Sequence, residues 1–158
     1  CDAPWHFMED GKKLDQIAPT IFFGKALLLD CTQAASITAD LLPDTPLPAR
    51  VLIQTTASAR PADAPFDREF AAVTPDAAQK LVDAGVRMIG FDGPSVGAYQ
   101  ESAPTHEILL GADVVIIEGL RLGGCTAGWY EFIVLPMALV GVDGAPCRAF
   151  LRLLPESS

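Results

Sequence analysis

The segment between residues 50 and 91 constrains the fold of this chain more than any other. Residues 50–55, RVLIQT, are an apolar run typical of a buried strand, and residues 86–91, VRMIGF, predict another. Between them, Thr74 and Pro75 predict a helix start, because threonine favours the N-cap and proline the first helical position. Gly85 then ends the helix. A strand, a helix and a strand in succession favour a mixed α/β fold.

The rest of the chain predicts more strands and few helices, separated by turns that contain proline or glycine. A long loop is expected over residues 56–73, and the chain of 158 residues shows no internal repeat. We therefore predict one domain over residues 1–158, built on a mixed sheet. The other expected strands are 21–31, 113–117, 131–140 (interrupted at Pro136) and 147–154, and the short helices are 37–42 and 104–110.

Charge and composition exclude several classes of partner. The net charge is −9 and the lysines and arginines are scattered, which argues against binding nucleic acid or an anionic membrane surface. No apolar run is long enough to span a bilayer. The cysteines form no CxxC pair, which favours reduced thiols and a cytoplasmic protein over a disulfide. They are Cys1, Cys31, Cys125 and Cys147.

The opening residues Asp2-Ala3-Pro4-Trp5-His6-Phe7 carry the first chemical signal. In an extended backbone, Asp2, Pro4 and His6 would point to one side, so a carboxylate and an imidazole would face the same place. That pairing is plausible as half of a metal site or an acid–base site. The only other histidine is His106, which alone would more readily be a surface or helix-capping residue.

Glu118 is the second signal, because it follows the aliphatic run 114–117. A carboxylate at the end of a buried strand is paired, metal-bound or protonated, unless it simply emerges into solvent. Asp92 also follows a strand, and open α/β sheets bind ligands at the carboxyl ends of their strands. Together, Asp2, His6, His106 and Glu118 offer the mixed nitrogen and oxygen ligands that suit zinc or manganese.

These residues fall into a pattern that resembles a known family. Residues 2–7 look like the second half of H-x-G-T-H-x-D-x-P-x-H-F, the motif of the cyclase-like metal-dependent hydrolases, which include bacterial kynurenine formamidase and isatin hydrolase. Residues 89–96, IGFDGPSV, are similar to the family segment I-G-I-D-x-P-S-x, and His106 and Glu118 match its downstream ligand pair. The resemblance extends to 118–120, 130–136 and 143–149, and so covers essentially the whole chain.

The resemblance implies a swivelling β/β/α domain that hydrolyses amides or lactams. It also implies roles for the candidate residues. It implies two divalent metal ions, zinc or else manganese, with Asp2 bridging them and His106 and Glu118 on the second ion. His6 is then expected to move the proton. Trp5, Phe7 and Ser95 are expected to bind substrate. Phe22 or Phe23 could extend the aromatic pocket, although a core role is equally open.

The position of Cys1 is expected to reflect a missing upstream part. The family motif places one metal-binding histidine directly before position 1 and another four residues earlier, so the chain as given should be a poor catalyst. The alternatives are an N-terminal cysteine nucleophile and a mature lipoprotein.

The substrate implied by the resemblance is N-formylkynurenine, hydrolysed to kynurenine and formate in tryptophan degradation. The segments 118–120 and 130–131 look nearer to the formamidases than to the isatin hydrolases. Gly93 and Gly97 depart from the threonine and aspartate expected there, which leaves lactam opening or polyketide cyclisation as alternatives. A metal-free binding domain is the non-enzyme alternative, and a homodimer is expected.

Overall fold

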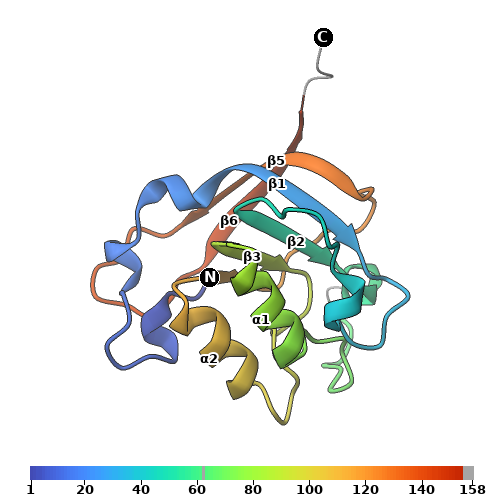
Figure 1. Cartoon of the computed structure of the whole chain (residues 1–158), viewed down its shortest axis with the longest axis horizontal. Helices are drawn as coiled ribbons and strands as arrows, with labels where there is room; N and C mark the ends of the chain where they lie inside the picture. The colour runs from blue at the N-terminus through green and yellow to red at the C-terminus, as the bar shows by residue number, and fades with distance from the viewer. Residues whose placement is uncertain (62, 155–158) are drawn as a thin grey trace.

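A curled, mixed β-sheet organises the molecule. The computed structural model describes residues 1–61 and 63–154. Within them, six strands form one sheet in the order β4-β3-β2-β1-β5-β6, and two α-helices cover it (Figure 1). The strands are β1 (Phe23–Asp30), β2 (Arg50–Gln54), β3 (Met88–Phe91), β4 (Val115–Ile117), β5 (Gly128–Pro136) and β6 (Cys147–Leu153); the helices are α1 (Pro75–Asp83) and α2 (Ala103–Gly111). The mixed α/β sheet with few helices that the sequence predicts is confirmed.

The four strands β1 to β4 are parallel, and their side chains alternate between two cores. Val51 and Ile53 of β2 pack in the core on the helix side of the sheet. Leu52, between them, faces the opposite core together with Met88 and Val115. Strands β2, β3 and β4 are buried on both faces, which explains why their sequences are nearly continuous apolar runs.

Helices α1 and α2 lie side by side on one face of the sheet (Figure 1). Helix α1 begins at Pro75 with Thr74 as its N-cap residue, as predicted. The Thr74 hydroxyl does not cap the helix; it donates a hydrogen bond to the Ile37 carbonyl 2.9 Å away. Leu81 of α1 and Leu109 of α2 are fully buried against the sheet.

The antiparallel strands β5 and β6 extend the sheet beyond β1 and close the second core. Tyr130 and Phe132 pack there against Ala26 and Leu28 of β1. The predicted interrupted strand over residues 131–140 is wrong at both ends, because the pairing with β1 starts at Gly128. Pro136 ends β5 instead of lying inside it, since proline has no N–H to donate to a strand ladder.

The opening residues are not extended throughout, so the predicted alternation of side chains there is wrong. Asp2 forms an isolated antiparallel bridge with Ile116 of β4, but Pro4–His6 make one turn of 3₁₀-helix. Proline at the first position suits that turn, and the His6 N–H closes it by donating to the Ala3 carbonyl 2.9 Å away. This turn, rather than the alternation of a strand, sets the direction of the His6 side chain.

The four cysteines are free thiols. Among the described residues, no helix has the length and apolar character required to cross a membrane.

Candidate metal centre

Three side chains from distant parts of the chain converge at the carboxyl end of β4. Asp2 comes from the N-terminal segment, His106 from α2 and Glu118 from the residue after β4. One ligand atom of each lies within 4.8 Å of the others. Two carboxylates and one imidazole form a donor set that fits zinc or manganese.

Asp2 is held in place by its own backbone. Its N–H donates to the Ile116 carbonyl at 2.8 Å, and its carbonyl accepts from the Ile116 N–H at 3.3 Å. Burial, and then the negative charge of Glu118, raise the pKa of the Asp2 carboxyl. A cation bound between the two carboxylates would offset both effects.

His106 presents one defined nitrogen to the cluster. Its Nδ1 lies 2.8 Å from the Ser102 carbonyl, which can only accept, so Nδ1 carries the proton. Nε2 then faces the Glu118 carboxylate at 3.3 Å. Burial lowers the pKa of His106, but the hydrogen bonds with Glu118 and Ser102 and the charges of Glu118 and Asp2 outweigh it, and the pKa is raised overall. A histidine fixed through Nδ1 in this way is preorganised as an Nε2 ligand.

Glu118 does not emerge into solvent as the strand ends. One of its oxygens accepts a hydrogen bond from the Val96 N–H at 2.6 Å, and only 21% of its side chain is exposed. Val96 belongs to the loop that follows β3, in which the half-buried Ser95 precedes it. Asp92, at the end of β3, is used differently: it accepts hydrogen bonds from the Thr55 N–H and hydroxyl, both at 2.8 Å. Asp92 therefore anchors a loop and lies outside the cluster.

His6 lies beside the cluster and is paired with a residue that the sequence analysis missed. Its Nδ1 is 2.7 Å from Oδ2 of Asp143, and its ring centroid is 6.3 Å from that of His106. The hydrogen bond with His6 lowers the pKa of Asp143. No local pattern could have revealed this contact, because 137 positions separate the two residues.

The predicted aromatic residues are divided between the site and the rest of the molecule. Phe7 stacks on His106, with ring centroids 4.6 Å apart, and Trp5 is exposed with Lys13 above its ring. Phe22 is buried in the second core, and Phe23 begins β1, at the opposite end of the parallel strands from Glu118. The suggestion that Phe22 or Phe23 lines the substrate pocket is therefore wrong.

Comparisons with known proteins find relatives of this chain among the cyclases and kynurenine formamidases. Residues 1–98 match the family model Cyclase, described as putative cyclase. The chain is 36% identical to a kynurenine formamidase from Salinibacter ruber, over 98% of this chain and 74% of the relative. It is 34% identical to cyclase-like protein 1 from Arabidopsis thaliana, over 95% of this chain and 63% of the relative, and so spans less than two thirds of that protein.

The fold is also found in solved structures. The structure of a potential metal-dependent hydrolase with cyclase activity superimposes with a TM-score of 0.86 at 38% identity, over 95% of this chain and 75% of that chain. Isatin hydrolase structures share the fold as well, but at 20–22% identity their likeness concerns the fold alone.

Proposed function

The chain belongs to the Cyclase family, and on that premise we propose that it is a metal-dependent hydrolase of amide carbon–nitrogen bonds. The proposed substrate is N-formylkynurenine, and the products are kynurenine and formate. The observation that carries the proposal is the cluster of Asp2, His106 and Glu118, found in a chain 36% identical to a kynurenine formamidase.

Asp2, His106 and Glu118 would hold the metal ion, zinc or manganese. A divalent ion at such a site supplies Lewis acidity, polarising a carbonyl and making water nucleophilic at neutral pH. The chain contributes the preorganisation: Ser102 fixes the tautomer of His106, and Val96 orients Glu118. The carboxylate of Asp2 has two oxygens, which supports its proposed place between two ions in the family arrangement.

His6 is the proposed proton carrier. With Nδ1 donating to Asp143, Nε2 is the atom that can take up a proton and deliver it to the leaving nitrogen. Asp143 would act as a positioning residue by fixing this tautomer and stabilising the imidazolium that forms. We place Trp5, Phe7 and Ser95 near the substrate, and Phe7, which stacks on His106, has the strongest support among them.

The assay compares two substrates. Purified full-length protein supplied with Zn²⁺ or Mn²⁺ is incubated with N-formylkynurenine or with isatin, and formate and kynurenine are measured. We expect metal-dependent formate release that falls sharply in His6→Ala and persists in Cys1→Ala. Protein that binds metal but opens isatin instead of releasing formate would overturn the substrate assignment.

The non-enzyme alternative has its own outcome in the same experiment. Elemental analysis that finds no divalent metal in the protein, together with equal rates for His6→Ala and wild type, would favour a metal-free binding domain. Sedimentation of the purified protein tests the homodimer that we propose with this function.

A further inference from the structure

A cavity of about 240 Å³ opens beside the candidate metal ligand Glu118. It lies between residues 118–122, which follow β4, and strand β6. Its walls combine apolar side chains, among them Leu120, Phe132 and Leu151, with the charged residues Glu118 and Arg121. The volume is slightly below the ~300 Å³ at which pockets for drug-sized ligands begin, so it suits a compact molecule with a single ring.

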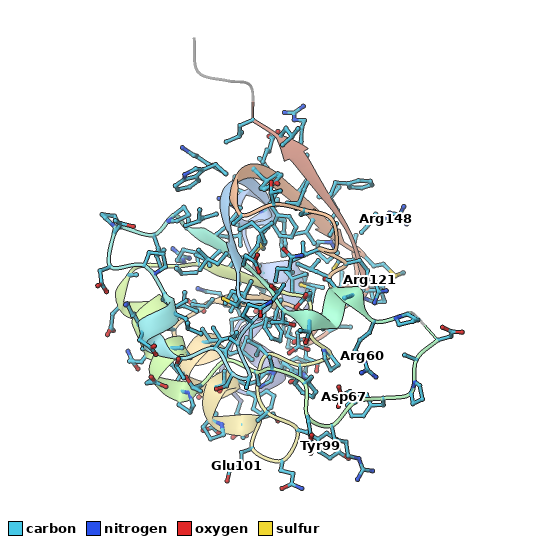
Figure 2. The ribbon with its side chains drawn as sticks, turned by 90° about the vertical axis from the view of Figure 1, so that its right-hand side faces the viewer. Arg60, Asp67, Tyr99, Glu101, Arg121 and Arg148 are labelled. Carbon is cyan, nitrogen blue, oxygen red and sulfur yellow. The ribbon has the colours of Figure 1, made fainter. Side chains whose placement is uncertain are left out.

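Arg121 is a cation that has no acidic partner among the described residues, in a chain with a net charge of −9. One of its N–H groups donates to the Arg60 carbonyl at 2.7 Å. Within residues 1–61 and 63–154, no carboxylate lies within 4.0 Å of its guanidinium. Arg60, in contrast, is paired with Asp67 at 3.0 Å. Figure 2 shows Arg148, Arg121 and Arg60 one below another, with Asp67 beside Arg60.

The backbone on both sides of Arg121 is held by hydrogen bonds, which fixes the point from which its exposed side chain extends. The Gly119 N–H donates to Gly93 at 2.9 Å, and the Leu120 N–H donates to Phe91 at 3.1 Å. The Leu122 N–H donates to the Ser58 hydroxyl at 2.8 Å. Because this segment is already ordered, little backbone freedom is lost when Arg121 takes up a ligand.

We propose that this cavity seats the aromatic part of the substrate and that Arg121 binds a carboxylate attached to it. The inference rests on the proposed function and adds to it a specificity-determining residue for anionic aryl amides. A guanidinium pairs with a carboxylate through two parallel N–H···O bonds, which gives both affinity and orientation. The neighbouring pocket that Arg121 also borders is lined by Asp67, Glu69 and Asp92, so it is less suited to an anion.

Equilibrium binding provides a test that does not depend on turnover. The ligands are L-kynurenine, which carries the carboxylate, and 2-aminoacetophenone, which keeps the ring and ketone without it. In Arg121→Gln, we expect the preference for kynurenine over the neutral ligand to fall about ten- to hundredfold, the range for a lost charge-assisted hydrogen bond. Arg121→Lys should recover part of the preference, because it restores the charge without the planar fork.

Arg148→Gln is the matched control, since Arg148 is also exposed on this face but does not line the cavity. It should keep the wild-type preference. A preference that survives in Arg121→Gln, or is lost in Arg148→Gln alone, overturns the inference.

Kinetics then separate this inference from the proposed function. With N-formylkynurenine, Arg121→Gln should raise KM more than it lowers kcat. Wild-type protein that binds kynurenine through Arg121 but hydrolyses no formamide would uphold the anion site and overturn the formamidase assignment. If wild-type protein hydrolysed N-formylkynurenine with the same KM as Arg121→Gln, the formamidase assignment would be upheld and the anion site at Arg121 would be overturned.

Discussion

Replacing Glu118 with glutamine should remove most of the metal affinity without disturbing the fold. Glutamine keeps an oxygen that can accept the Val96 N–H, now 2.6 Å from the carboxylate, but it removes one of the two negative charges in the cluster. Loss of an outer-shell partner already weakens metal binding about 10–100-fold, so loss of a charged ligand should cost at least about 100-fold.

The expected size of the effect follows from linkage between binding and folding. With free Zn²⁺ at about 100 times the wild-type Kd, binding stabilises the folded state by about 2.7 kcal/mol. For a chain of this size, that corresponds to a rise in Tm of about 5–11 °C. In Glu118→Gln, the same Zn²⁺ concentration would only equal Kd, leaving about 0.4 kcal/mol and a rise of about 1 °C.

Glu131→Gln is the matched control for this measurement. Its carboxylate is exposed to a similar extent, 25% against 21% for Glu118, and is paired with Arg152 on the neighbouring strand instead of the cluster. Thermal unfolding is measured with EDTA and with Zn²⁺, and calorimetry gives Kd directly. If Zn²⁺ raised the Tm of Glu118→Gln as much as that of wild type and Glu131→Gln, Glu118 would not be a ligand.

Three further changes test the groups around the cluster. Asp143→Asn should lower kcat for N-formylkynurenine at least about tenfold and leave Zn²⁺ affinity intact, because it removes the charged partner of His6. Gly144→Ala should weaken Zn²⁺ binding in calorimetry, since the added Cβ would lie 2.5 Å from the Cys1 carbonyl and 3.3 Å from Oδ1 of Asp2. In EDTA, the free energy of unfolding in urea should decrease as pH rises above about 6.5. The folded-state pKa of His106 is raised, so its contribution is complete below the unfolded value and is lost through the folded one.

Each of these changes has a control or a contrary outcome. Asp44→Asn removes another exposed carboxylate paired with a cation and should leave kcat unchanged. Gly111→Ala adds a Cβ that meets only Met8, at an ordinary 3.7 Å, and should keep Zn²⁺ affinity. A decline in stability with pH that is equally steep in His106→Gln would show that another group causes it.

The parts of the fold that depend on local pattern could be predicted from the sequence. Buried parallel strands read as apolar runs, and Thr74-Pro75 marks a helix start, because both signals arise from neighbouring residues. The start of β5 could not be predicted in this way. Gly128 and Trp129 are ordered there by pairing with Leu28 and Leu27 of β1, a partner that lies about a hundred positions away.

The candidate site also combines residues with a local sequence signal and residues identified only by contacts between distant parts of the chain. Glu118 could be singled out from the sequence because it follows a buried strand, and ligands bind at the carboxyl ends of such strands. His106 lies on a helix, and only the family resemblance paired it with Glu118. Asp143 and Arg121 could not be identified as candidate site residues from the sequence. One acts through a contact 137 positions away, and the other is distinguished only by a cavity and by the missing acidic partner among the described residues.

Two glycines outside the set of candidate ligands also shape the site. A Cβ at Gly11 would lie 2.5 Å from the Pro4 carbonyl carbon, and one at Gly144 would lie 2.5 Å from the Cys1 carbonyl oxygen. Both glycines therefore let the segment that carries Asp2 and His6 approach the rest of the fold closely. Burial and then the charge of Glu118 raise the pKa of Asp2, so the docking of this segment and the binding of a cation should be coupled. Zn²⁺ should then protect the Asp2–Ile116 backbone bridge from hydrogen exchange more than it protects the centre of β2.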